Sequence, residues 1–107
     1  MNSLMHFTYP KFVDEGCKTD GYHERARLAS HGVMSEAGEL GDEWKKVFWH
    51  GKELNREAVI LEMGDVLWYF TLMCVNEGIS FEEIMEANMA KILARRAKEH
   101  ADGPFPK

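Results

Sequence analysis

The chain has 107 residues, 45% of them hydrophobic, and a formal net charge of -5. This length allows one hydrophobic core and is short for two, so we expect a single domain over residues 1–107. The acidic balance argues against a nucleic-acid binder, which needs basic surface to neutralise phosphates. The two cysteines lie outside any CxxC or Cys/His cluster and the first residues lack a signal-peptide pattern, so we expect a cytoplasmic protein.

The hydrophobic spacing predicts helices and no strand. A short helix is expected over residues 7–15, and Thr19 and Asp20 in the loop after it are candidates to cap the next helix. That long helix is expected over residues 22–48. It ends near Gly51, which can adopt the left-handed conformation that stops a helix.

A third helix is expected over residues 55–76, closed by Gly78. Its stretch 58–75 is almost wholly apolar and nearly long enough to span a bilayer. Glu62 and Asp65 lie at its centre, where acids are costly in lipid, so we expect no membrane association. A helix that is apolar nearly all round needs cover on more than one side. One short chain hardly supplies that cover, which predicts a homo-oligomer.

A fourth helix is expected over residues 80–100, with Ser80 and Glu83 in a capping box at its start. The Gly-Pro-Phe-Pro segment at 103–106 cannot be helical. Helices joined by short connections predict an all-α, up-and-down bundle whose core is completed by homo-oligomerisation.

Four acids form two helical pairs, Glu36-x-x-Glu39 and Glu62-x-x-Asp65. A spacing of three places each pair on one helix face, with Cβ atoms about 5–6 Å apart. Two facing helices could bring all four together, and hard cations such as Mg²⁺ prefer oxygen ligands. Buried carboxylates otherwise neutralise or pair, so a structural salt bridge to a Lys or Arg of another helix is an equal alternative.

Three glycines lie inside predicted helices beside these acids: Gly38, Gly41 and Gly64. Each costs about 1 kcal/mol relative to alanine. This cost fits a functional site and equally fits close helix packing. Glu43 continues the row of Glu36 and is expected at a solvated position more than at a metal.

The fourth helix carries polar residues on its apolar face. The apolar members of that face are Phe81, Ile84, Met85 and Ile92. Asn88, Lys91 and Arg95 fall on the same face at helical spacing. Lys and Arg there require anionic company, either the acids of the other helices or the phosphates of a ligand.

These motifs resemble those of the MazG-like, all-α nucleotide pyrophosphohydrolases. The pattern of that superfamily is ExxE, an intervening stretch, ExxD, and N-x-x-K-x-x-x-R on the last helix. Here it reads Glu36-Ala-Gly-Glu39, Glu62-Met-Gly-Asp65 and Asn88-Met-Ala-Lys91-Ile-Leu-Ala-Arg95. The strings SEAGELGDEWKK and EMGDVLWY are also typical, and the resemblance covers roughly residues 28–96.

The resemblance implies magnesium-dependent hydrolysis of nucleoside triphosphates, dNTPs above all, to monophosphate and pyrophosphate, in control of the nucleotide pool. The metal, Mg²⁺ or Mn²⁺, would be held by Glu36, Glu39, Glu62 and Asp65. Glu36 or Glu39 would be catalytic, one of them as general base. The triphosphate would contact Asn88, Lys91 and Arg95. The resemblance also implies a homodimer or homotetramer.

Aromatic residues are candidates for stacking on the nucleobase, Trp68 and Tyr69 before Trp44 and Trp49, although aromatics at helical spacing are more often core. A di-iron bundle is disfavoured because no histidine follows a glutamate by three. The non-enzymatic alternative is a helical dimerisation or regulatory module with a structural buried charge network, which predicts no dependence on metal.

Overall fold

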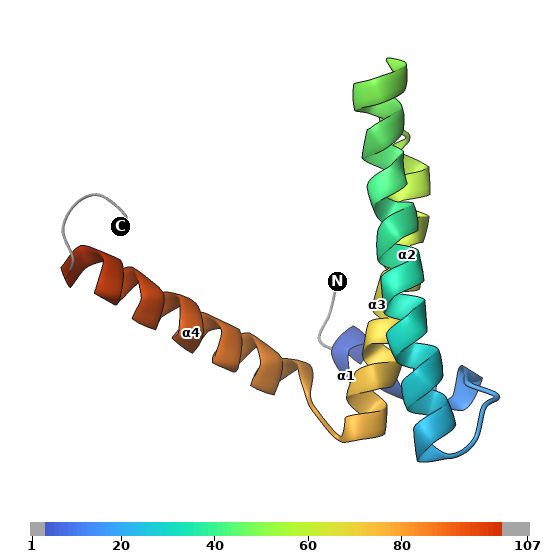
Figure 1. Ribbon diagram of the computed structural model, residues 1–107. Coiled ribbons are helices and arrows are strands. Elements are labelled where there is room, and N and C mark those ends of the chain that lie inside the picture. Colours follow the sequence, from blue (N-terminus) through green and yellow to red (C-terminus); the bar gives the residue numbers. More distant parts are fainter. Residues whose placement is uncertain (1–3, 102–107) are drawn as a thin grey trace. The chain divides into compact units, whose positions relative to one another are not determined.

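The computed structural model describes residues 4–101, which form four helices and no strand (Figure 1). The helices are α1 (Leu4–Gly16), α2 (Tyr22–His50), α3 (Arg56–Glu77) and α4 (Phe81–Ala101). The all-α prediction is confirmed, and every helix ends within three residues of its predicted bounds. The segment at 103–106 lies outside the described residues.

Local signals in the sequence explain where the later helices begin and end. Gly51, at φ 63°, ends α2, and Gly78, at φ 69°, closes α3. Asn55 caps α3, because its Oδ1 accepts a hydrogen bond from the backbone N–H of Ala58 at 3.1 Å.

The predicted capping box starts α4. The backbone N–H of Glu83 donates to Ser80 Oγ at 3.1 Å, and the backbone N–H of Ser80 donates to Glu83 Oε1 at 3.3 Å. This prediction is confirmed.

The predicted side-chain cap of α2 is wrong. Gly21, at φ 88°, holds the cap position and α2 has no side-chain cap hydrogen bond. Thr19 and Asp20 therefore lie one or two residues too early to reach the first turn. Thr19 instead accepts a contact at its backbone oxygen from the Cys17 thiol, at 3.7 Å.

The chain divides into two compact units, Met1–Glu77 and Gly78–Lys107, and each is described by itself. In the first unit α2 and α3 lie side by side and antiparallel, and α1 packs where α2 begins and α3 ends (Figure 1). One residue from each helix, Val13, Ala29 and Leu72, forms a fully buried core at that end. Burial of apolar side chains from all three helices holds this end together.

Polar contacts fasten the same end. Arg25 Nη2 of α2 donates to Asp14 Oδ1 of α1 at 2.7 Å. Asn76 Nδ2 donates to the backbone oxygen of Tyr22 at 3.1 Å, and the Tyr22 hydroxyl donates to Glu77. These bonds tie the start of α2 to the end of α3.

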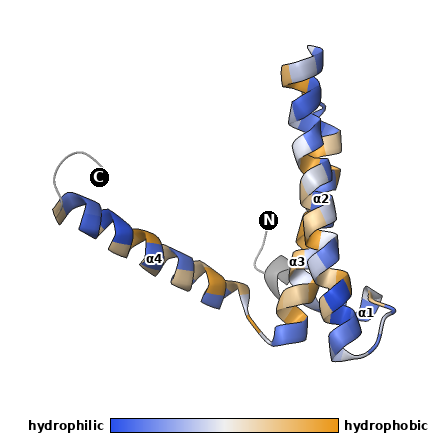
Figure 2. Cartoon of the chain, viewed as in Figure 1, coloured by the Kyte–Doolittle hydropathy of each residue, from blue (hydrophilic) through white to orange (hydrophobic). Residues whose placement is uncertain are grey.

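The other end of the helix pair leaves apolar surface open. Apolar residues recur along the visible part of α3 (Figure 2), and by length and composition alone the helix is long and apolar enough to cross a membrane. Ile60, Met63 and Leu67 are 53%, 54% and 44% exposed. The first unit by itself therefore leaves part of α3 uncovered.

Candidate metal centre

The facing surfaces of α2 and α3 bring three of the four predicted ligands together. Glu36 of α2 and Glu62 and Asp65 of α3 each place one carboxylate oxygen so that the three lie within 4.8 Å of one another. Two ligands on opposite sides of a Mg²⁺ ion are roughly 4.2 Å apart. We call this cluster the carboxylate triad. With small side-chain adjustments its three oxygens could bind one cation.

The triad has polar atoms that the first unit does not satisfy. Oε2 of Glu36 and Oε2 of Glu62 are buried and have no hydrogen-bond partner. The ion pairs of this unit are Lys11–Glu15, Arg25–Asp14, Arg27–Glu24 and Lys46–Glu43. None of them involves the triad, so within residues 4–77 the salt-bridge alternative does not account for these acids. An all-oxygen donor set with buried unpaired oxygens fits a hard divalent cation.

Glu36 is the most perturbed of these acids. Burial raises its pKa to about 6, and the negative charges of Glu39, Asp65 and Glu62 act in the same direction. A cation among these oxygens would relieve the repulsion between them.

Glu39 lies beside Glu36 on α2 and is exposed. It is not part of the carboxylate triad. An exposed carboxylate beside a metal centre is suited to take up a proton, the role of a general base.

Sequence reasoning missed Tyr9 as a neighbour of this site. The side chain is half-buried and packs against the core cluster. Burial and the negative charge of Asp65 raise the pKa of the Tyr9 phenol. No spacing within the sequence signals this proximity, because it depends on how α1 docks on α3.

Gly32 is a second residue that sequence reasoning missed. A Cβ added at Gly32 would lie 2.2 Å from Cδ1 of Tyr69, so the Tyr69 ring rests directly on the α2 backbone. At Gly38, Gly41 and Gly64 a Cβ would meet nothing within 4 Å. Close packing within the first unit thus explains Gly32 and none of the other three. The missed signal was available, since Gly32 also lies inside a predicted helix near Glu36.

The aromatic candidates differ in accessibility. Trp68 is half-buried, packs against the core cluster and meets Tyr69 edge-on with ring centroids 5.2 Å apart. Trp44 and Trp49 are 38% and 77% exposed. Trp68 and Tyr69, the two residues predicted to stack on the nucleobase, therefore contribute to helix packing in the first unit.

The prediction of a solvated Glu43 is wrong. The residue is 8% exposed, and its carboxylate accepts a hydrogen bond from Lys46 Nζ at 3.0 Å. The reason is geometric: Glu43 lies two turns after Glu36, on the side of α2 that meets α3. Glu43 is not in the carboxylate triad.

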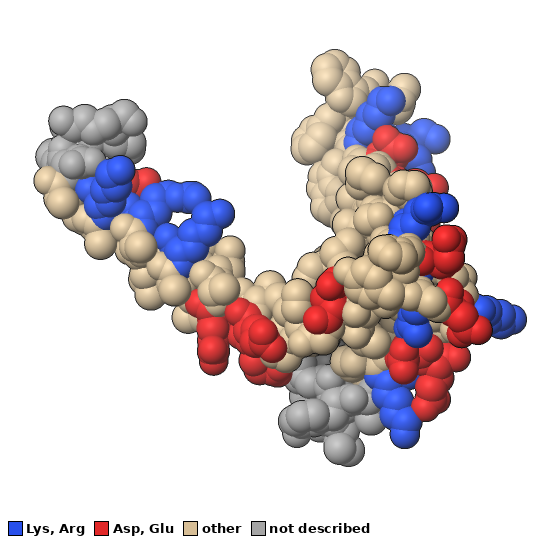
Figure 3. Space-filling model, turned by 60° about the horizontal axis from the view of Figure 1, so that its bottom comes forward, with Lys and Arg blue, Asp and Glu red and all other residues tan. Residues whose placement is uncertain are grey.

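The predicted phosphate-binding residues lie on α4, in the second unit. Asn88, Lys91 and Arg95 are exposed there, and α4 has no buried residue. The expectation that they face a core is not met within this unit, because a single helix has no interior to face. Figure 3 shows acidic side chains near the start of α4 and basic ones toward its end, an order that complements the helix dipole.

The chain is thus an all-α protein whose antiparallel helices α2 and α3 carry a candidate site for a divalent cation. The family profile of the MazG nucleotide pyrophosphohydrolase domain matches residues 26–100. The chain belongs to this family, which implies nucleotide pyrophosphohydrolase activity. The match leaves out α1 and includes the triad and the polar residues of α4. No curated protein and no solved structure matches the chain.

Proposed function

We propose that this protein is a magnesium-dependent pyrophosphohydrolase that cleaves dNTPs to monophosphate and pyrophosphate. The observation that carries the proposal is the carboxylate triad, with buried, unpartnered oxygens on Glu36 and Glu62. Family membership supplies the class of reaction. We also propose a cytoplasmic role in controlling the nucleotide pool.

Glu36, Glu62 and Asp65 would hold Mg²⁺ or Mn²⁺, with Glu39 beside them. The metal would supply an activated water and offset the negative charge of the phosphates. Glu39 is exposed and outside the triad, so it is the better placed of the two α2 glutamates to accept a proton. Glu36, partly buried, serves better as a ligand.

The triphosphate requires cations, which the triad lacks. Lys91 and Arg95 lie one turn apart on α4 and are exposed, with Asn88 one turn earlier. Lys offers a point charge and Arg a planar fork, and both suit phosphate oxygens. We propose that these three residues bind the triphosphate and that Trp68 and Tyr69 border the base.

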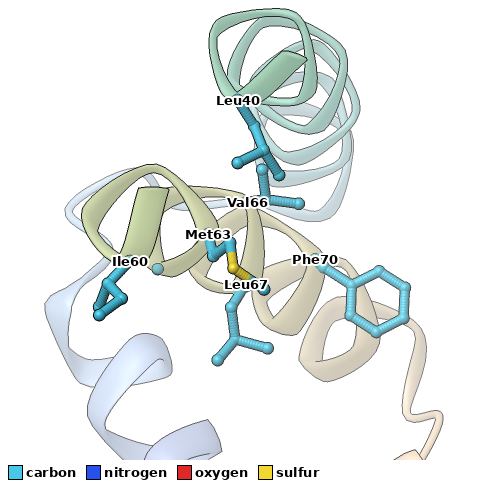
Figure 4. A pocket seen from close by; sticks show the side chains of 7 residues that line it. Leu40, Ile60, Met63, Val66, Leu67 and Phe70 are labelled. Carbon is cyan, nitrogen blue, oxygen red and sulfur yellow. The ribbon is translucent and has the colours of Figure 1, made fainter. Parts of the chain in front are cut away.

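A homo-oligomer completes this proposal. An open pocket of about 670 Å³ lies on the α2–α3 pair, lined by Leu40 from α2 and by residues of α3 (Figure 4). The α3 residues are Ile60, Met63, Gly64, Val66, Leu67 and Phe70. This surface, the apolar groove, has no charged residue in its lining, so a second apolar surface suits it. A second copy of the chain offers the same surface and would form a symmetric contact.

The test is to incubate the purified protein with each dNTP and NTP, with and without Mg²⁺, and to separate the products by ion-exchange chromatography. Monophosphate and pyrophosphate, formed only with metal, are expected, and the initial rates rank the substrates. Diphosphate and orthophosphate would contradict the bond proposed. No turnover of any nucleotide would favour a non-enzymatic helical module with a structural charge network.

A further inference from the structure

A close contact between α2 and α3 lies next to the carboxylate triad. Gly32 is one turn before Glu36 on α2, and Tyr69 is one turn after Asp65 on α3. Because the two helices run antiparallel, the Gly32–Tyr69 contact forms the layer beside the acids (Figure 1).

This contact leaves no room between the ring and the helix. A Cβ at Gly32 would lie 2.2, 2.3 and 2.6 Å from Cδ1, Cγ and Cε1 of Tyr69. The Cγ atom is the root of the ring, so rotation of the ring about χ2 does not move it, and only a change of χ1 or a backbone shift does. Trp68 also meets the ring edge-on. A larger residue at position 32 must therefore turn the Tyr69 side chain out of its place or separate α2 from α3.

We infer that Gly32 and Tyr69 are positioning residues, which together set the separation of α2 and α3 at the metal centre. The inference rests on the proposed metal site. Magnesium requires near-ideal octahedral geometry with oxygens at about 2.0–2.1 Å, so a small displacement of Glu36 from the α3 acids weakens binding. Glycine is less favourable than alanine inside a helix, and the contact with Tyr69 explains why glycine occupies position 32.

The test measures binding of Mn²⁺ alone, by electron paramagnetic resonance and calorimetry, without nucleotide. Gly32→Ala should weaken Mn²⁺ binding about tenfold or more while the circular dichroism stays helical, as for residues that orient metal ligands. Gly38→Ala is the matched control, since it makes the same change on the same helix in open space. This control should bind Mn²⁺ as the unaltered protein does.

A double-mutant cycle separates positioning from a general loss of structure. In a Tyr69→Ala background, where the ring is gone, Gly32→Ala should change Mn²⁺ affinity less than twofold. An equal loss in both backgrounds would overturn the inference, and so would unchanged binding by Gly32→Ala. If Gly32→Ala does not fold, Tyr69→Ala alone should weaken Mn²⁺ binding, and unchanged affinity would overturn the inference. No Mn²⁺ binding by the unaltered protein would instead overturn the metal site itself, and the positioning role with it.

Discussion

Glu36 shows how one carboxylate links metal binding to the stability of the fold. Burial and the charges of Glu39, Asp65 and Glu62 raise its pKa from 4.5 to about 6. Its charged form is therefore disfavoured in the folded, metal-free protein. The resulting stabilisation is fully present below the unfolded-state pKa and is lost as the pH rises through about 6.

We predict that, without metal, the melting temperature of the unaltered protein falls between pH 4.5 and about 6 relative to that of Glu36→Gln. Glutamine carries no charge, so the variant lacks this contribution to the pH dependence. Thermal unfolding by circular dichroism in a chelating buffer measures both proteins. Parallel curves for the two would contradict the assignment of the raised pKa to Glu36.

The Glu36 carboxyl also predicts that the stabilisation by Mg²⁺ increases with pH. Protons compete with the metal for Glu36, so stabilisation by Mg²⁺ should be small below about pH 6 and should grow above it. The shift in melting temperature on adding Mg²⁺, measured across this range, checks the sign. A shift that is independent of pH would contradict ligation by Glu36.

Asp65 is the most accessible of the triad. We predict that Asp65→Ala abolishes turnover and weakens Mn²⁺ binding, while the helices stay folded because the change removes a repulsive charge. Steady-state rates and circular dichroism measure the two effects. Glu57→Ala is the control, an exposed acid in the first turn of the same helix. Full activity in Asp65→Ala would remove this residue from the site.

At the scale of helices, the sequence predicts what short-range chemistry decides. The Ser80–Glu83 capping box and the terminal glycines Gly51 and Gly78 act within one turn, so their pattern is sufficient. The i,i+3 spacing of the acids likewise predicts which side chains share a face, and α2 and α3 bring Glu36, Glu62 and Asp65 together as expected.

Features that depend on the docking of one helix on another could not be predicted. The burial of Glu43 depends on which side of α2 meets α3, and the proximity of Tyr9 to Asp65 depends on where α1 packs. The Gly32–Tyr69 contact requires the register between two helices. The wrong prediction of the α2 cap has a different cause, because Gly21, with its positive φ, occupies the cap position in place of Thr19 or Asp20.

The open glycines of α2 predict a gain in stability. Gly38→Ala and Gly41→Ala should each stabilise the fold by about 0.5–1 kcal/mol, because alanine restricts the unfolded chain and a Cβ at either position meets nothing within 4 Å. Urea unfolding, with the midpoint compared at equal slope, measures the change. A loss of stability would show that the position is covered in the assembled protein.

At the scale of the whole molecule, α3 contributes to two different surfaces, the carboxylate triad and the apolar groove. Leu67 follows Asp65 by two residues and so points to the opposite side of the helix, into the apolar groove. Most of the apolar groove therefore lies on the side of α3 away from Asp65, while Val66, one turn after Glu62, lines its edge nearest the triad. On the face seen in Figure 3, charged side chains gather along one side of the first unit and leave a broad uncharged area.

We predict that Leu67→Glu lowers the oligomeric state, because a charge buried in an apolar contact has no partner. Size-exclusion chromatography with light scattering measures the mass over a range of protein concentrations. Leu61→Glu is the control, since Leu61 is 71% exposed and lies outside the groove. An unaltered protein that is monomeric at every concentration would contradict the oligomer proposal.

The hydrogen bonds between Tyr22 and the pair Asn76 and Glu77 have a consequence for how the chain folds. They join residues 54 and 55 positions apart, whereas the turn between α2 and α3 joins near neighbours. Closing a short loop costs less entropy than closing a long one, so pairing of the two helices can start at the turn and proceed toward Tyr22. Contacts made after the rate-limiting step mainly affect unfolding. The Tyr22 hydrogen bonds would then lower the rate at which α2 and α3 separate, with little influence on the rate at which they pair.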